Sequence, residues 1–216
     1  MEERIQHELD ALLTNYPQLS NCTGDILAAF ELMKKTCRNG GVIMTCGNGG
    51  SAADAEHIVG ELMKGFKLKR PVTGEQREAL ATAFPGDGCY LADNLQRGIP
   101  AISLVSQSSL LSAYINDMTP DMAFAQQVFG YGAAGDVLIA ISTSGNAKNV
   151  VNACKVAGAF GISTIAMTGE SGGEMLGLCD VTIRVPASET FRVQEYHLPV
   201  YHTLCAMLEN ELFWED

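Results

Sequence analysis

A short apolar run, a glycine-rich loop and a helical pattern follow one another early in this chain, and this combination most restricts its fold. Residues 42–46 are mostly apolar and indicate a buried strand, Gly47 to Gly50 form the loop, and a helix is expected from about Ser51 to Phe66. Such a loop can bring backbone N–H groups close to an anion, and the helix N-terminus adds partial positive charge. The loop matches neither the GxGxxG dinucleotide motif nor the P-loop.

Further apolar runs alternate with helical patterns along the chain, at 101–105, 136–141, 162–167 and 181–185. Five buried strands separated by helices predict an α/β fold, a three-layer α-β-α sandwich around a five-stranded parallel sheet. Residues 1–40 carry apolar residues at helical spacing and are expected to form a helical arm used in packing or oligomerisation. A last long helix is predicted over 190–213, and residues 1–216 are interpreted as one domain.

Residues 67–99 do not follow this alternation. Short helices are expected at about 75–83 and 89–95, separated by a proline- and glycine-containing turn. A connection of this length is unusual inside a compact domain, so we expect an inserted, exposed excursion or lid. Lys67, Lys69 and Arg70 at its start could reach an anion, but a solvated turn is the more ordinary interpretation.

Charge and composition exclude several classes of partner. The net charge is −11 and there is no basic stripe, which argues against direct nucleic-acid binding. No apolar run approaches the roughly 18–20 residues that a membrane span needs. The seven cysteines contain no CxxC motif and are typical of reduced thiols. We therefore expect a cytoplasmic protein, and a local nest of N–H groups would still allow it to bind a small anion.

Polar side chains that could carry chemistry lie on two predicted helices. His57 and Glu61 are spaced i, i+4 and share one helix face, where they could bind a metal or transfer protons. Such a pair is more often an ordinary surface pair. The C-terminal helix carries further candidates, among which helical phase alone does not choose: Gln194, Glu195, His197 and His202. Pro199 lies among them and predicts a kink.

A second polar loop, Ser142–Asn146, follows the third predicted strand and opens a helix. Ligands of open parallel sheets bind at the carboxyl ends of the strands, and these hydroxyl and N–H groups suit a phosphate monoester. The alternative is an ordinary helix N-cap, for which Ser, Thr and Asn are favoured. Two such loops at neighbouring strand ends favour a binding site. Asn116-Asp117 is either a helix cap or an acceptor for sugar hydroxyls.

These motifs together resemble those of SIS (sugar isomerase) domains, and they occur in the order expected of that family: 46–51 (CGNGGS), 141–146 (ISTSGN), 167–169 (MTG), 183–186 (IRVP) and 193–197 (VQEYH). Within the family the chain is similar to the phosphoheptose isomerases, apart from residues 67–99. The resemblance implies a flavodoxin-like SIS fold and a zinc-dependent isomerase converting sedoheptulose 7-phosphate to D-glycero-D-manno-heptose 7-phosphate. It also implies a homotetramer with sites between subunits.

The resemblance also implies roles for individual residues. The zinc ligands would be His57, Glu61, Gln194 and His202, so the family selects Gln194 where helical phase could not. The phosphate would be held by Ser142, Thr143 and Ser144. Contacts to the rest of the substrate would come from Asn48, Gly49, Gly50, Ser51, Asn116, Asp117 and Gln194. For the proton transfers, our hypothesis makes Glu61 the base and His202 the acid.

Three features depart from the family pattern. Ala147 replaces a serine that usually contacts phosphate, Pro199 interrupts the stretch between Gln194 and His202, and residues 67–99 are longer than expected. They leave open an isomerase that acts on a different phosphosugar. A second alternative is a non-catalytic SIS binding module that associates with a replication initiator, a subgroup that the C-terminal Glu211-Leu212-Phe213-Trp214 resembles.

Overall fold

Five parallel strands form the centre of the protein in the order β2-β1-β3-β4-β5, in a computed structural model that describes residues 3–214. The strands are β1 (Ile43–Gly47), β2 (Ala101–Ser103), β3 (Val137–Ile141), β4 (Ser163–Thr168) and β5 (Val181–Arg184). β1 pairs with β2 on one side and β3 on the other, so the chain changes direction across the sheet at β1. The predicted five-stranded parallel sheet is confirmed, and its strand order is that of flavodoxin-like folds.

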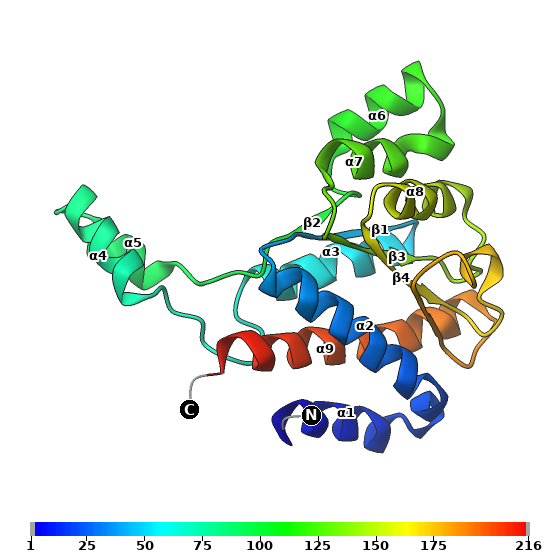
Figure 1. Cartoon of the computed structure of the whole chain (residues 1–216), viewed down its shortest axis with the longest axis horizontal. Coiled ribbons are helices and arrows are strands. Elements are labelled where there is room, and N and C mark those ends of the chain that lie inside the picture. Colours follow the sequence, from blue (N-terminus) through cyan, green and yellow to red (C-terminus); the bar gives the residue numbers. More distant parts are fainter. Residues whose placement is uncertain (1–2, 215–216) are drawn as a thin grey trace.

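Helices cover both faces of this sheet because successive side chains of each buried strand point to opposite faces. Ile43 and Ile139 pack on one face, while Met44 and Leu138 pack on the other. The first face is covered by α2 (Thr23–Arg38), α3 (Gly50–Met63) and α9 (Thr190–Phe213), and α1 (Glu3–Asn15) packs against α9. The second face is covered by α7 (Ala123–Tyr131) and α8 (Lys148–Ala159) (Figure 1). The result is the predicted three-layer sandwich.

Short elements make the remaining connections between strands and helices. These are η1 (Pro17–Cys22), α4 (Gly74–Ala83), α5 (Gly88–Asn94), α6 (Ser108–Asp117), η2 (Pro120–Met122) and η3 (Gly173–Met175). Among the helices of residues 3–214, none is long and apolar enough to cross a membrane.

The C-terminal helix spans the range expected from the sequence, and it continues through Pro199. Proline removes one backbone donor inside a helix, so a bend was expected at this point. Pro199 is buried, and the Thr203 hydroxyl donates to its carbonyl oxygen at 2.9 Å. The helix therefore carries residues on both sides of Pro199 along the length of α3.

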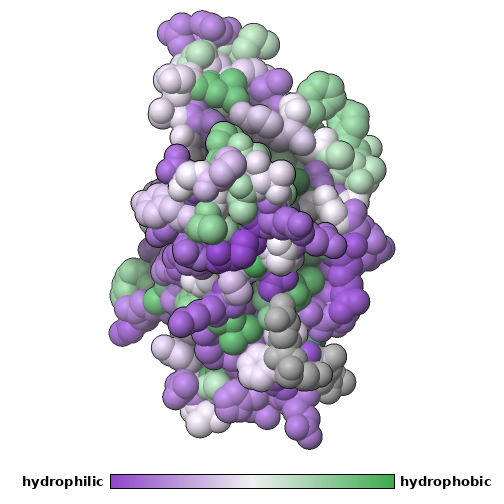
Figure 2. All heavy atoms as spheres, turned by 90° about the vertical axis from the view of Figure 1, so that its left-hand side faces the viewer, coloured by the Kyte–Doolittle hydropathy of each residue, from purple (hydrophilic) through white to green (hydrophobic). Residues whose placement is uncertain are grey.

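Residues 67–99 form a helical hairpin that stands away from the sandwich, as the α4–α5 label pair in Figure 1 shows. Thr73 and Gln76 form a capping box that starts α4, yet no residue of α4 is buried. Phe84, Tyr90 and Leu95 are exposed on this segment. On the side of the molecule that carries the hairpin, apolar and polar residues are intermixed at the surface (Figure 2). The segment is therefore an exposed helical hairpin.

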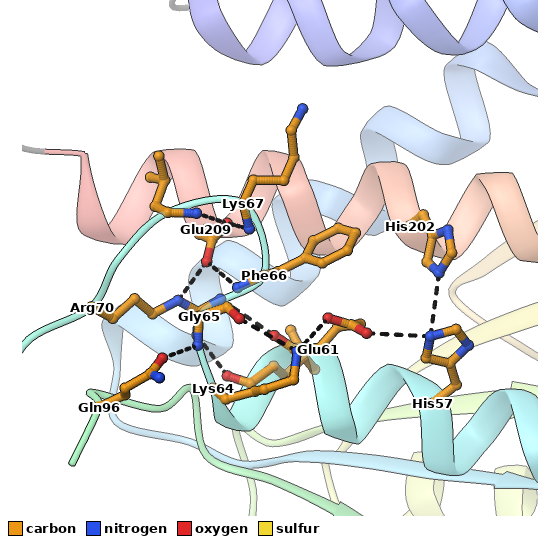
Figure 3. Close-up of polar contacts among 12 residues, drawn as sticks. His57, Glu61, Lys64, Gly65, Phe66, Lys67, Arg70, Gln96, His202 and Glu209 are labelled. Atoms are coloured by element: carbon orange, nitrogen blue, oxygen red, sulfur yellow. Dashed lines mark hydrogen bonds and ion pairs between the residues drawn. The ribbon is translucent and has the colours of Figure 1, made fainter. Parts of the chain in front are cut away.

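The base of the excursion is held by a buried ion pair between Arg70 and Glu209 of α9. Arg70 Nε donates to Glu209 Oε1 at 2.7 Å, and the two side chains are 0% and 1% exposed. Glu209 also accepts the backbone N–H groups of Phe66, Lys67 and Leu68 at 2.7–3.0 Å (Figure 3). The interpretation of Arg70 as part of a solvated turn was wrong, because its side chain is buried. Its partner Glu209 lies 139 residues later in the sequence, so the neighbouring Lys67 and Lys69 gave no sign of the ion pair.

Arg70 also fixes the C-terminal end of α3. Its Nη1 donates to the Leu62 carbonyl at 2.7 Å, and its Nη2 donates to the Glu61 carbonyl at 3.3 Å. Burial would raise the pKa of Glu209, but the N–H donors of Phe66 and Lys67 and the Arg70 guanidinium outweigh it and lower the pKa. The ionised pair therefore joins α3, α9 and the excursion at one point.

Replacing Arg70 with alanine is expected to destabilise the protein by about 3–5 kcal/mol, because Glu209 would be left buried without its charge partner. Urea unfolding at pH 7 measures this change. Because the pKa of Glu209 in the folded state lies below its ordinary value of 4.5, the ionised carboxylate stabilises the fold at pH values above 4.5. That contribution is lost as the pH falls through the folded-state pKa. Exposed Lys69→Ala is the control and should change stability by less than about 0.5 kcal/mol. Equal effects of the two variants would contradict the ion pair's role.

Candidate functional site

A cavity of about 310 Å³ lies where the loops after β1 and β3 meet at the carboxyl edge of the sheet. These two strands flank the point at which the strand order reverses, the usual ligand position in open α/β sheets. Its lining includes eight of the predicted binding residues, together with Thr190 at the start of α9: Asn48, Gly49, Gly50, Ser51, Ser142, Thr143, Ser144 and Gln194. Ile141 and Ala147 complete the lining. The two polar loops predicted to form a site therefore do so together.

The two loops are fixed to each other and to their surroundings. Asn48 in the loop after β1 and Asn149 in the first turn of α8, which follows the other loop, exchange two amide hydrogen bonds, each 2.9 Å long. Gly145 has a φ of +68°, and a Cβ there would overlap the Gly172 carbonyl, so only glycine fits this turn. The cavity wall is therefore held in place by hydrogen bonds and by close backbone packing.

Hydroxyl, amide and backbone groups give this cavity its chemistry. Ser142 Oγ accepts the N–H of Ala147 at 3.4 Å, and Ser144 Oγ accepts the N–H of Asn146 at 3.2 Å. No lysine or arginine is among the residues that line the cavity in the described part of the chain. An anion held here would be bound by hydroxyl and N–H donors rather than by a cationic side chain.

A second group of polar side chains lies further along α3, where α9 packs against it (Figure 3). His57 Nε2 lies 3.2 Å from Glu61 Oε1 and 3.5 Å from His202 Nε2. Lys64 Nζ contacts the other Glu61 oxygen at 3.0 Å. Burial and the neighbouring His57 lower the pKa of His202, although Glu61 opposes them, so its imidazole is neutral at pH 7. The structure thus brings a carboxylate and two imidazoles together.

The far side of the His57 ring contacts Tyr201, which the sequence analysis did not single out. Tyr201 Oη lies 2.9 Å from His57 Nδ1 and donates to Asp54 Oδ1 at 3.3 Å. Burial and the Asp54 carboxylate raise the pKa of the Tyr201 hydroxyl, which therefore keeps its proton. Asp54 precedes His57 by three residues, so helical spacing already placed the two on one face. Tyr201 gave no such signal, because only the packing of α9 on α3 brings it there.

Gln194 lies in the cavity and not with the imidazole cluster. Its amide packs against Gly50 so closely that a Cβ at position 50 would overlap it. His202 follows Gln194 by eight residues, which is about 12 Å along a helix. The structure therefore brings His57, Glu61 and His202 together and places Gln194 beside the cavity loop.

Other candidates from the sequence lie elsewhere. Asn116 and Asp117 end α6, where they are exposed and hydrogen-bonded to each other at 2.8 Å, and they do not line the cavity. His197 is fully buried against the Thr168 carbonyl, and burial lowers its pKa to about 4, so it is a neutral core residue. Glu195 is exposed and pairs with Arg192. Of the two candidate histidines on α9, His197 therefore belongs to the core and His202 to the polar cluster.

The imidazole–carboxylate cluster has the donor chemistry of a zinc site in part. Two ligands bonded at about 2.1 Å to a tetrahedral zinc ion lie about 3.4 Å apart, close to both His57 separations. Within residues 3–214, however, no group of three or more His, Cys, Asp or Glu side chains is arranged so that all of them could hold one metal ion. The cluster therefore offers ligand pairs that share His57.

Comparison with known proteins gives one consistent result. The SIS domain family matches residues 9–84 and 91–169. A phosphoheptose isomerase from Aliarcobacter butzleri is 41% identical over 184 residues, 85% of this chain and 84% of the relative. A phosphoheptose isomerase from Akkermansia muciniphila is 34% identical over 213 residues, 99% of both chains.

Solved structures give the same answer at the level of the fold. A phosphoheptose isomerase from Neisseria gonorrhoeae superimposes with a TM-score of 0.69 at 32% identity, covering 94% of this chain and 97% of the other. A phosphoheptose isomerase from Francisella tularensis gives a TM-score of 0.71 at 26% identity, covering 94% and 98%.

Replacing Gly50 with alanine is expected to displace the Gln194 amide from the cavity, because the new methyl group would occupy its place. Loss of a hydrogen bond of about 0.5–1.5 kcal/mol should weaken binding of sugar phosphates about 2–10-fold, measured by titration calorimetry. The free energy of unfolding should stay within about 1 kcal/mol, since a flexible side-chain end can move. Gly60→Ala on the same helix faces open space and is the matched control. Unchanged binding by the Gly50 variant would show that Gln194 does not contact the ligand.

Proposed function

This chain belongs to the SIS domain family and is a phosphosugar isomerase, and on that premise we propose that it interconverts sedoheptulose 7-phosphate and D-glycero-D-manno-heptose 7-phosphate. One observation carries the proposal. A hydroxyl-lined cavity and a carboxylate–imidazole cluster lie on the same helix, α3, at its first turn and two to three turns further on. A phosphate bound at one end would leave the sugar chain to extend toward the other.

The cavity supports the binding part of this proposal. Ser142, Thr143 and Ser144 would hold the phosphate, and residues 48–51 together with Gln194 would contact the sugar. Ala147 lines the cavity without a hydroxyl, so phosphate contacts there come from its neighbours. The position of Gln194 supports a substrate contact more directly than a metal contact.

The cluster supports the proton transfers of an aldose–ketose isomerisation. In our proposal Glu61 removes the proton from the carbon next to the carbonyl group, and His202 supplies a proton to the resulting enediolate. Arg70 binds the backbone carbonyl of Glu61, and Lys64 binds its carboxylate, so the base is held at the end of α3. His202 is neutral at pH 7, so the proton that it supplies is one that it first accepts from the substrate hydroxyl that becomes the new carbonyl group. Glu61 then returns its proton to the former carbonyl oxygen, and both side chains recover their starting state.

We propose zinc as the cofactor, with His57, Glu61 and His202 as the residues that would hold it. Two imidazoles and a carboxylate form a donor set that zinc prefers, and when bound the ion would polarise the substrate oxygens as a Lewis acid. The two separations at His57 support this assignment, and binding requires side-chain adjustment before all three donors meet.

The proposal also includes a cytoplasmic homotetramer. Asn116 and Asp117 are exposed and do not line the cavity of their own chain, which supports a role for them at another subunit's site.

A coupled isomerisation assay on a panel of ketose phosphates, with and without a chelator, tests this function. Turnover should be greatest with sedoheptulose 7-phosphate and should be lost when the chelator is present. Turnover that survives complete metal removal would contradict the zinc proposal. Binding of the sugar phosphates without turnover of any of them would favour a non-catalytic binding module, and preference for another sugar would revise the substrate.

Glu61→Gln should lower turnover by about 10²–10⁴-fold, the usual contribution of a positioned base, while phosphate binding is retained. Glu56→Gln is the matched control, because Glu56 is exposed on the same helix and bonds to Ser106 instead of the cluster. Full activity in the Glu61 variant would reject Glu61 as the base.

A further inference from the structure

We propose that Tyr201 is a positioning residue that works with Asp54 to hold His57 with its ring proton on Nδ1. In that tautomer the lone pair of Nε2 faces Glu61 and His202. The tautomer of His57 is argued from contacts alone. Only the role of Nε2 as a zinc ligand rests on the proposed function. The proposal assigns a role to two residues on the side of His57 opposite to Glu61.

The direction of the hydrogen bonds follows from the donors that each group has. An ionised carboxylate only accepts hydrogen bonds, so the single proton of the Tyr201 hydroxyl goes to Asp54 Oδ1 at 3.3 Å. The hydroxyl oxygen is then an acceptor for the group 2.9 Å away, and that group is His57 Nδ1. With the hydroxyl proton directed to Asp54, the ring nitrogen at that contact is the donor and carries the proton.

The opposite arrangement leaves Asp54 without a donor. If Tyr201 donated to Nδ1, Asp54 Oδ1 would lose this hydrogen bond, and Oδ2 is already buried with no partner among the described residues. A buried carboxylate without donors is costly. Asp54 therefore selects the direction of the Tyr201 hydroxyl, and the hydroxyl selects the tautomer of His57.

Packing fixes the hydroxyl at this place. Tyr201 is 1% exposed, and its ring meets the His57 ring edge-on at a centroid distance of 5.5 Å and an interplanar angle of 72°. His57 itself is partly exposed, with 42% of its side chain accessible, so burial alone does not fix its ring. The buried residue thus orients the accessible one.

The consequence appears on the other side of the ring. With the proton on Nδ1, His57 Nε2 and Glu61 Oε1 are two acceptors 3.2 Å apart, which is unfavourable until a cation lies between them, and His202 Nε2 lies 3.5 Å away. Such a group is suited to a cation. Histidines that bind metals commonly donate their second N–H to a carboxylate or a similar acceptor. Here a tyrosine hydroxyl is inserted between the imidazole and the carboxylate.

Nitrogen-15 NMR of the full chain with labelled histidine, at pH 8 and without metal, tests the assignment. Wild type should show the His57 proton on Nδ1. Tyr201→Phe removes only the hydroxyl and should shift His57 toward the Nε2–H form. Asp54→Ala should do the same, because the freed hydroxyl would donate to Nδ1. Tyr196→Phe on the same helix is the control and should leave the spectrum unchanged.

Zinc affinity, measured by competition with a chromophoric chelator, gives a second readout. Tyr201→Phe should weaken zinc binding about 10–100-fold relative to Tyr196→Phe, as found for residues that orient a metal ligand. A wild-type His57 with its proton on Nε2, or an unchanged His57 spectrum in the Tyr201 variant, would overturn the inference. Absence of zinc binding in wild type would reject the proposed cofactor, whereas the NMR result would still decide the role of Tyr201.

Discussion

The packing of α9 against α3 is the contact on which the candidate site depends. Gln194 contacts Gly50 at the first turn of α3, and Tyr201 and His202 contact the His57 ring near the middle of α3. Glu209 binds the residues that follow the C-terminal end of α3. The two helices match each other in register over this whole length. A change in that register would separate the cavity, the imidazole cluster and the buried ion pair at the same time.

This arrangement divides the work between two elements of different character. The carboxyl ends of β1 and β3 provide a cavity of neutral donors, which suits an anion inside a chain with a net charge of −11. The α3–α9 pair provides the ionisable groups, His57 and Glu61 from α3 and His202 from α9. Burial lowers the pKa of His202 and keeps it neutral at pH 7. Arg70 donates a hydrogen bond to the backbone carbonyl of Glu61.

The local pattern of the sequence was sufficient for most of the fold. Alternating apolar runs and helical spacing gave five parallel strands and the long last helix, because strand and helix periods are properties of short segments. Arg70 was misjudged and Tyr201 was overlooked for one reason. Their partners, Glu209 and His57, are 139 and 144 residues away in the sequence.

The sequence by itself determined the two polar loops, the i, i+4 pair of His57 and Glu61, and the sheet that carries them, since each depends on neighbouring residues. Only the tertiary structure decided that Gln194 belongs to the cavity and that His202 belongs to the cluster. Both lie on one helix, and helical phase does not indicate which part of a neighbouring helix each residue faces. The packing of α9 on α3 supplies that information, because it fixes the axial position of every side chain between them.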